Sequence, residues 1–168
     1  MPSLNLSSGA RVHFVEDGGG DDTFVLVHGL GGSHLNWRSV HAPLAKRGRV
    51  LAPDLGGFGR TAPPTEGSHV DANLALLADF VRTTAPGRRV VLVGNSMGAY
   101  LSLRLAAEHP TLVRALVLVD PAAPVPLGAK VDPTVAAMFA TYMLPGVAQG
   151  LMRRRAATKG DYRSRTPS

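Results

Sequence analysis

The chain contains no cysteine, and this absence removes several chemistries at once. Without thiols there is no disulfide framework, no thiolate nucleophile and no metal site built on cysteine. Long apolar runs are also missing, so no segment is expected to cross a membrane. The first residues lack a basic stretch followed by an apolar one, so no signal peptide is expected and the default compartment is the cytoplasm.

Charge is also sparse, and its excess is confined to one end of the sequence. Charged residues make up 18% and apolar residues 45% of the 168 residues, a balance typical of one folded α/β domain. Residues 151–168 hold six basic residues and one acidic residue, and these account for +5 of the net charge of +6. Because aromatic residues do not alternate with these arginines, no nucleic-acid partner is expected.

Short apolar runs alternate with segments of helical periodicity along the chain. Strands are expected at 4–6, 12–15, 24–27, 50–52, 90–93 and 115–119, the first two forming a hairpin and the last one buried. Helices are expected at about 36–46, at about 70–83 and directly after residue 96. Unbroken apolar strands that alternate with helices indicate an α/β fold with a mostly parallel sheet covered on both faces.

Residues 90–108 are the most informative segment. An apolar strand leads into GNSMG at 94–98, and a helical pattern follows, which is the context of a nucleophile elbow. Ser96 is therefore expected in a strained backbone conformation, with no room for side chains at Gly94 and Gly98. The Met97 amide is expected to face a developing oxyanion. The alternative is a glycine-rich turn without catalytic function.

Two further glycine-rich motifs also follow expected strands. HGLGG at 28–32 places the Leu30 amide where it could be the second oxyanion donor, beside that of Met97. A phosphate-binding loop is the rival reading, but the sequence has neither Gly-x-Gly-x-x-Gly nor a Walker lysine. DLGGFGR at 54–60 follows the strand at 50–52. Ligands of parallel sheets bind beyond such strand ends, so all three motifs are expected near one site.

Together these motifs and RALVLVDP at 114–121 resemble the α/β-hydrolase superfamily over residues 4–126. The resemblance implies that Ser96 is the nucleophile and that Leu30 and Met97 form the oxyanion hole. It implies an α/β-hydrolase fold truncated after the sixth strand: a partial core at 1–126, the start of lid or cap helices at 127–152, and a basic, disordered tail at 153–168. No cofactor and no metal are expected.

A catalytic triad also needs a histidine and a carboxylate, which follow the serine in this family. The only histidine after Ser96 is His109, at the end of the expected helix and therefore expected at its solvent side. His28 is expected to be a structural member of the HG turn, and the others (His13, His34, His41 and His69) do not occupy the family's base position. Asp120 is a candidate acid, and its alternative role is to cap the loop before Pro121.

These observations lead to two functional hypotheses. The first is a serine hydrolase that cleaves an ester or related acyl bond, carbon–carbon bonds included, through an acyl-enzyme on Ser96. The second is a truncated, catalytically impaired or inactive remnant that acts at most as a ligand-binding module. The expected partner is a small ester or acyl substrate. An apolar strand at 115–119 at the edge of a sheet would also favour self-association, unless a lid helix covers it.

Overall fold

The computed structural model describes residues 3–65, 67–122 and 133. The chain divides into two compact units, Met1–Ala123 and Pro124–Ser168. All the elements described below belong to the first unit. The lid helices expected at 127–152 and the tail expected at 153–168 lie outside the described residues, apart from Pro133.

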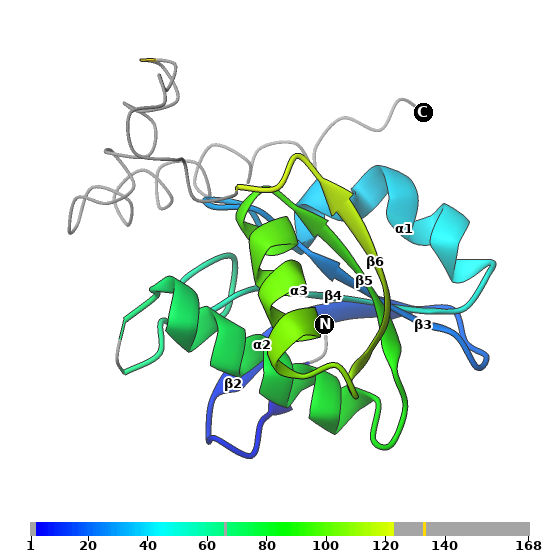
Figure 1. The fold of residues 1–168 in the computed structure, drawn as a ribbon, viewed down its shortest axis with the longest axis horizontal. Coiled ribbons are helices and arrows are strands. Elements are labelled where there is room, and N and C mark those ends of the chain that lie inside the picture. The colour runs from blue at the N-terminus through cyan, green and yellow to red at the C-terminus, as the bar shows by residue number, and fades with distance from the viewer. Residues whose placement is uncertain (1–2, 66, 123–132, 134–168) are drawn as a thin grey trace, which may run out of the picture. The chain divides into compact units, whose positions relative to one another are not determined.

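A six-stranded sheet forms the centre of this unit (Figure 1). The strand order is β1-β2-β4-β3-β5-β6. The first two strands form the expected antiparallel hairpin. The other four, β4, β3, β5 and β6, run parallel to one another, and Val27 of β3 pairs with Gly94 of β5. The strands are β1 (Ser3–Asn5), β2 (Arg11–Asp17), β3 (Thr23–Val27), β4 (Arg49–Pro53), β5 (Val90–Asn95) and β6 (Val113–Val119). The predicted mostly parallel α/β sheet is confirmed.

Helices cover both faces of the sheet. In Figure 1, α2 (Val70–Thr84) and α3 (Met97–Glu108) lie side by side on one face, and α1 (Arg38–Ala45) lies on the other. The single helix expected at 36–46 is in fact two pieces, because a one-turn 3₁₀ helix, η1 (His34–Trp37), precedes α1. Ser33 caps this turn, accepting a hydrogen bond from the Leu35 amide at 3.3 Å. Such a side-chain cap fixes where a helix begins.

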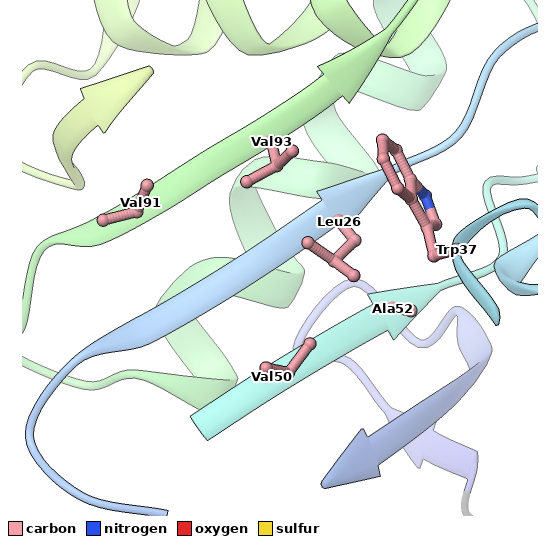
Figure 2. Close-up of a cluster of buried hydrophobic side chains, with 6 residues drawn as sticks. All are labelled: Leu26, Trp37, Val50, Ala52, Val91 and Val93. Atoms are coloured by element: carbon pink, nitrogen blue, oxygen red, sulfur yellow. The ribbon is translucent and has the colours of Figure 1, made fainter. Parts of the chain in front are cut away.

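The hydrophobic core fills both sides of the sheet. On the α1 side, the Trp37 ring lies over side chains of the three central strands (Figure 2): Leu26, Val50, Ala52, Val91 and Val93. On the other side, the residues of α2 that were expected to point inward are buried: Leu74, Leu77, Phe80 and Val81. Burial of these apolar surfaces is the main stabilising term for such a layered unit.

The last strand corrects one expectation. Residues 115–119 were expected as a buried strand or, without a covering lid helix, as an apolar sheet edge. The second expectation holds, because β6 is an edge strand whose Val117, Leu118 and Val119 are 48%, 36% and 46% exposed. No strand within 3–122 pairs with its outer edge. An apolar run predicts a strand, but it does not say whether neighbours cover that strand. An apolar groove of about 420 Å³ runs beside β6 and is lined by residues that include Trp37, Leu44 and Val93.

Among the described helices, none combines the length and the apolar character that a bilayer span requires.

Candidate active site

Ser96 sits at the sharp turn between β5 and α3. Its backbone dihedrals are φ 52° and ψ −116°, so the expected strained conformation is confirmed. Two close approaches fix the turn. A Cβ atom on Gly94 would lie 2.5 Å from the Ala99 Cα, and one on Gly98 would overlap the carbonyl oxygen of Val27. Non-glycine residues rarely hold a positive φ, and such strain is concentrated at functional sites.

The end of β6 is joined to this turn. The Ser96 amide donates to the Val119 carbonyl oxygen at 2.9 Å, and the Ser96 carbonyl oxygen accepts from the Ala122 amide at 3.2 Å. Asp120 therefore lies next to the elbow, with a φ of 46° and an exposed side chain. Its carboxylate makes no ion pair with a histidine among the described residues. The structure places the candidate acid near Ser96 without showing a catalytic role.

The loop of the HGLGG motif lies against the elbow. A Cβ atom on Gly29 would be 3.2 Å from the Ser96 Cβ, which shows how close the two turns are. Gly31 has a φ of 70°, and the Gly32 amide donates to the Gly29 carbonyl oxygen at 3.0 Å, closing a tight turn around Leu30. Neither the Leu30 amide nor the Met97 amide donates a hydrogen bond to any described residue. Within the part of the chain that the structure describes, both amides are therefore without a protein acceptor.

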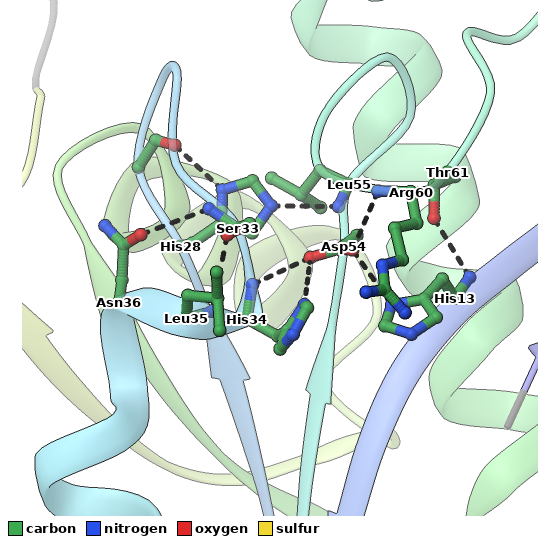
Figure 3. Close-up of polar contacts among 11 residues, drawn as sticks. His13, His28, Ser33, His34, Leu35, Asn36, Asp54, Leu55, Arg60 and Thr61 are labelled. Atoms are coloured by element: carbon green, nitrogen blue, oxygen red, sulfur yellow. Dashed lines mark hydrogen bonds and ion pairs between the residues drawn. The ribbon is translucent and has the colours of Figure 1, made fainter. Parts of the chain in front are cut away.

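His28 is fully buried at the base of this loop (Figure 3). Its Nε2 accepts a hydrogen bond from the Leu55 amide at 3.0 Å, so its Nδ1 carries the proton and donates to the Gly29 carbonyl oxygen at 2.8 Å. Burial lowers the pKa of His28, which favours the neutral ring. With both nitrogens engaged, His28 cannot accept a proton from Ser96, which confirms its expected structural role.

Asp54, directly after β4, is the centre of a buried polar cluster that the sequence did not predict. One carboxylate oxygen accepts the His34 amide at 2.7 Å and the His34 Nδ1 at 2.9 Å. The other accepts the Arg60 amide and the His13 Nδ1, each at 2.9 Å (Figure 3). Burial alone would raise the pKa of Asp54, but the hydrogen bonds from His34 and Arg60 outweigh it and hold that pKa below its ordinary value.

Three of these side chains, from His13, His34 and Asp54, form the one group among the described residues that could surround a metal ion. Donor atoms of His13, His34 and Asp54 lie within 4.8 Å of one another. Two histidines and one carboxylate are a donor set found in metal sites. The hydrogen bonds between the two imidazoles and the carboxylate already account for this arrangement. The signal that could have located the cluster is strand pairing, because Phe14, next to His13, pairs with Pro53, next to Asp54.

The other histidines are not paired with Ser96. His109 follows the C-terminal end of α3, whereas Ser96 precedes its first residue, and a 12-residue helix is about 18 Å long. His69 caps α2, and the His41 Nδ1 lies 4.0 Å from an Asp17 carboxylate oxygen. All six histidines of the chain are described, and none donates to or accepts from the Ser96 hydroxyl. The expectation that His109 ends a helix at its solvent side is confirmed.

Comparison with known proteins identifies the family. The family model of the alpha/beta hydrolase fold matches residues 22–160. This chain belongs to the α/β-hydrolase family. The strained Ser96, the HGLGG loop and the strand order therefore occur together in a member of that family.

Individual relatives agree with the family. Over 119 residues the chain is 38% identical to 2-hydroxy-6-oxo-6-(2'-aminophenyl)hexa-2,4-dienoic acid hydrolase of Metapseudomonas resinovorans, covering 69% of this chain and 41% of that protein. It is 43% identical over 118 residues to 2-hydroxy-6-oxo-2,4-heptadienoate hydrolase of Pseudomonas putida, covering 67% and 42%. Among solved structures, Cfl2 of Burkholderia cenocepacia matches with a TM-score of 0.74 and 30% identity, over 95% of this chain and 55% of that one. The chain thus spans about two fifths of the length of these curated relatives.

Proposed function

We propose that this α/β hydrolase is a serine hydrolase that cleaves an ester or related acyl bond, with Ser96 as its nucleophile. The observation that carries the proposal is the position of Ser96 on a strained turn, close to two backbone amides without described partners. A turn of this kind presents the hydroxyl above the sheet, and the free amides of Leu30 and Met97 supply an oxyanion hole.

In the proposed reaction, the Ser96 Oγ bonds to the carbonyl carbon of the substrate, and the serine proton passes to the leaving group. The carbonyl electron pair moves onto the oxygen, which accepts hydrogen bonds from the amides of Leu30 and Met97. One such donor contributes about 3 kcal/mol to the transition state in well-studied enzymes. Expulsion of the protonated leaving group gives an acyl-enzyme, and attack by water then releases the acid and restores the serine.

We propose Asp120 as the carboxylate of the catalytic triad. It directly follows β6, and the carbonyl oxygen of its neighbour Val119 accepts a hydrogen bond from the Ser96 amide. The names of two relatives support a substrate range that includes carbon–carbon bonds beside a carbonyl group, since both are hydrolases of 2-hydroxy-6-oxo-dienoic acids. A small molecule with an electrophilic carbonyl carbon is the common feature of these substrates.

A second candidate function is a binding module that holds such a carbonyl compound without turning it over. The observation that favours it is the placement of the six histidines, none of which is bonded to the Ser96 hydroxyl. A serine without a base is a weak nucleophile, although an intact oxyanion hole still leaves residual activity.

One experiment separates the two candidates. A fluorophosphonate probe and p-nitrophenyl ester turnover are compared in the wild type, Ser96→Ala and Ser102→Ala. Ser102 is the matched control, because it lies on α3, the helix that follows Ser96, but its hydroxyl donates to the Gly98 carbonyl oxygen at 2.7 Å. Labelling and turnover that vanish only in Ser96→Ala support the serine hydrolase. Wild-type protein that binds the substrate but shows neither signal supports the binding module, and signals unchanged in Ser96→Ala contradict the hydrolase proposal.

A further inference from the structure

The segment that carries Leu30 has little support of its own. Three of the five residues at 29–33 are glycines. Within this segment the structure shows one backbone hydrogen bond, from the Gly32 amide to the Gly29 carbonyl oxygen at 3.0 Å. Glycine has more backbone freedom than any other residue, so a segment of this composition keeps one conformation only when it is held from outside.

Both ends of the segment are attached to two consecutive residues that follow β4 (Figure 3). At the β3 end, the His28 ring accepts from the Leu55 amide at 3.0 Å and donates to the Gly29 carbonyl oxygen at 2.8 Å. At the far end, His34 donates to one oxygen of Asp54 through its amide at 2.7 Å and through its Nδ1 at 2.9 Å. The glycine-rich turn is thus fastened at its start and at its end.

The attachment point is itself rigid. Asp54 is fully buried, and its amide donates to the His13 carbonyl oxygen at 2.8 Å. Its second oxygen accepts from the His13 ring and from the Arg60 amide. Hydrogen bonds to an ionised carboxylate are about twice as strong as those between neutral groups, so four of them hold this side chain in one orientation.

We infer that Asp54 is a positioning residue for the oxyanion loop. Through His34 it fixes the far end of residues 29–33, while Leu55 fixes the near end through His28. The Leu30 amide lies between these two attachments and owes its direction to them. The benefit to catalysis rests on the proposed function, whereas the restraint on the loop depends on the fold alone.

Asp54→Asn tests the restraint, and Asp79→Asn is its matched control. The asparagine nitrogen replaces one acceptor oxygen, so an N–H group that Asp54 now accepts loses its partner. Asp79 is also a buried aspartate, but it accepts from the Ser7 hydroxyl at 2.6 Å and the Ser8 amide at 3.0 Å, at the β1–β2 turn. Both variants should lose global stability, and only the first should release the oxyanion loop.

The measurement is residue-resolved amide hydrogen exchange in the full chain, read at Gly32 and Asn36. Neither amide is bonded to Asp54: the Gly32 amide donates to Gly29 and the Asn36 amide to Ser33. We expect both to exchange about tenfold faster or more in Asp54→Asn, the size expected for the loss of a charge-assisted hydrogen bond. In Asp79→Asn they should exchange as in the wild type. Unchanged exchange in Asp54→Asn, or an equal increase in both variants, would overturn the inference.

A second variant and a second measurement distinguish a failure of the restraint from a failure of the hydrolase proposal. If Asp54→Asn does not fold, His34→Gln removes only the ring contact and should still speed exchange at Gly32. Fluorophosphonate labelling then reports on catalysis: where the wild type is labelled, Asp54→Asn should slow the rate about tenfold and Asp79→Asn should leave it unchanged. A chain that no probe labels contradicts the proposed hydrolase, and the exchange data still decide the restraint.

Discussion

Gly98 of α3 touches the carbonyl group of Val27 so closely that no side chain fits between them. The helix that follows Ser96 is thereby packed directly on the end of β3. We predict that Gly98→Ala lowers the free energy of unfolding by about 1–3 kcal/mol, because backbone atoms on both sides would have to move. Urea unfolding measures the change.

Gly19→Ala is the control for this prediction. Gly19 has open space around it and no positive φ, so an added methyl group meets nothing within 4 Å. Its stability should be unchanged or slightly increased, because alanine restricts the unfolded chain. Equal midpoints for the two variants would contradict the packing argument.

The strained backbone of Ser96 is expected to reduce the free energy of unfolding. Its positive φ costs a non-glycine residue about 1–3 kcal/mol. Glycine adopts this conformation freely, so Ser96→Gly should raise the free energy of unfolding by about 1 kcal/mol while removing the proposed nucleophile. Ser102→Gly, in the interior of α3, should instead lower it by a similar amount. Thermal unfolding of both variants tests the sign, and a loss of stability in Ser96→Gly would show that the elbow is not strained.

Acid should destabilise the folded chain in two stages. Burial lowers the pKa of His13 and of His28 below the ordinary value of 6.5, so the unfolded chain binds these protons more readily. Stability present at neutral pH is therefore lost as the pH falls below about 6.5. The lowered pKa of Asp54 adds a second loss once the pH falls through its folded value.

Urea unfolding at a series of pH values measures both stages. His13→Gln should flatten the first stage, because one of the two histidines with a lowered pKa is gone. A stability that does not change between pH 8 and pH 5 would contradict the assignment of neutral, buried rings.

The edge strand β6 predicts self-association. Its exposed Val117, Leu118 and Val119 and its unpaired edge within the described chain are the features that promote strand pairing between molecules. Val117→Lys should lower the weight-average sedimentation coefficient at high protein concentration. Leu103→Lys is the control, since Leu103 is 46% exposed on α3 and should not matter. A wild type that stays monomeric at all concentrations would refute this prediction.

The elbow and the sheet could be predicted from the sequence because their signals are local. A run of apolar residues, GNSMG and a helical pattern follow each other within residues 90–108, and α2 shows its buried face as a simple periodicity. The exposure of β6 could not be predicted from its apolar run alone, since it depends on which strands lie beside it, and the sequence left both a buried strand and a sheet edge open.

The Asp54 cluster was missed for a related reason. Its partners His13 and His34 are 41 and 20 residues away in sequence, and only the antiparallel register of β2 against β4 brings His13 into reach. A buried aspartate at the end of β4 needs hydrogen-bond donors, but which residues supply them depends on the fold.

The register of β3 against β5 has a consequence for the spacing of the proposed oxyanion donors. Val27 and Gly94 are the last paired residues of these strands. Leu30 and Met97 each follow their paired residue by three positions, so both amides are measured from the same rung of the ladder. A slip of one residue would displace one donor by about 3.3 Å, the rise of one strand residue. Strand pairing therefore starts both turns at the same level of the sheet, and the attachments of residues 29–33 then direct the Leu30 amide.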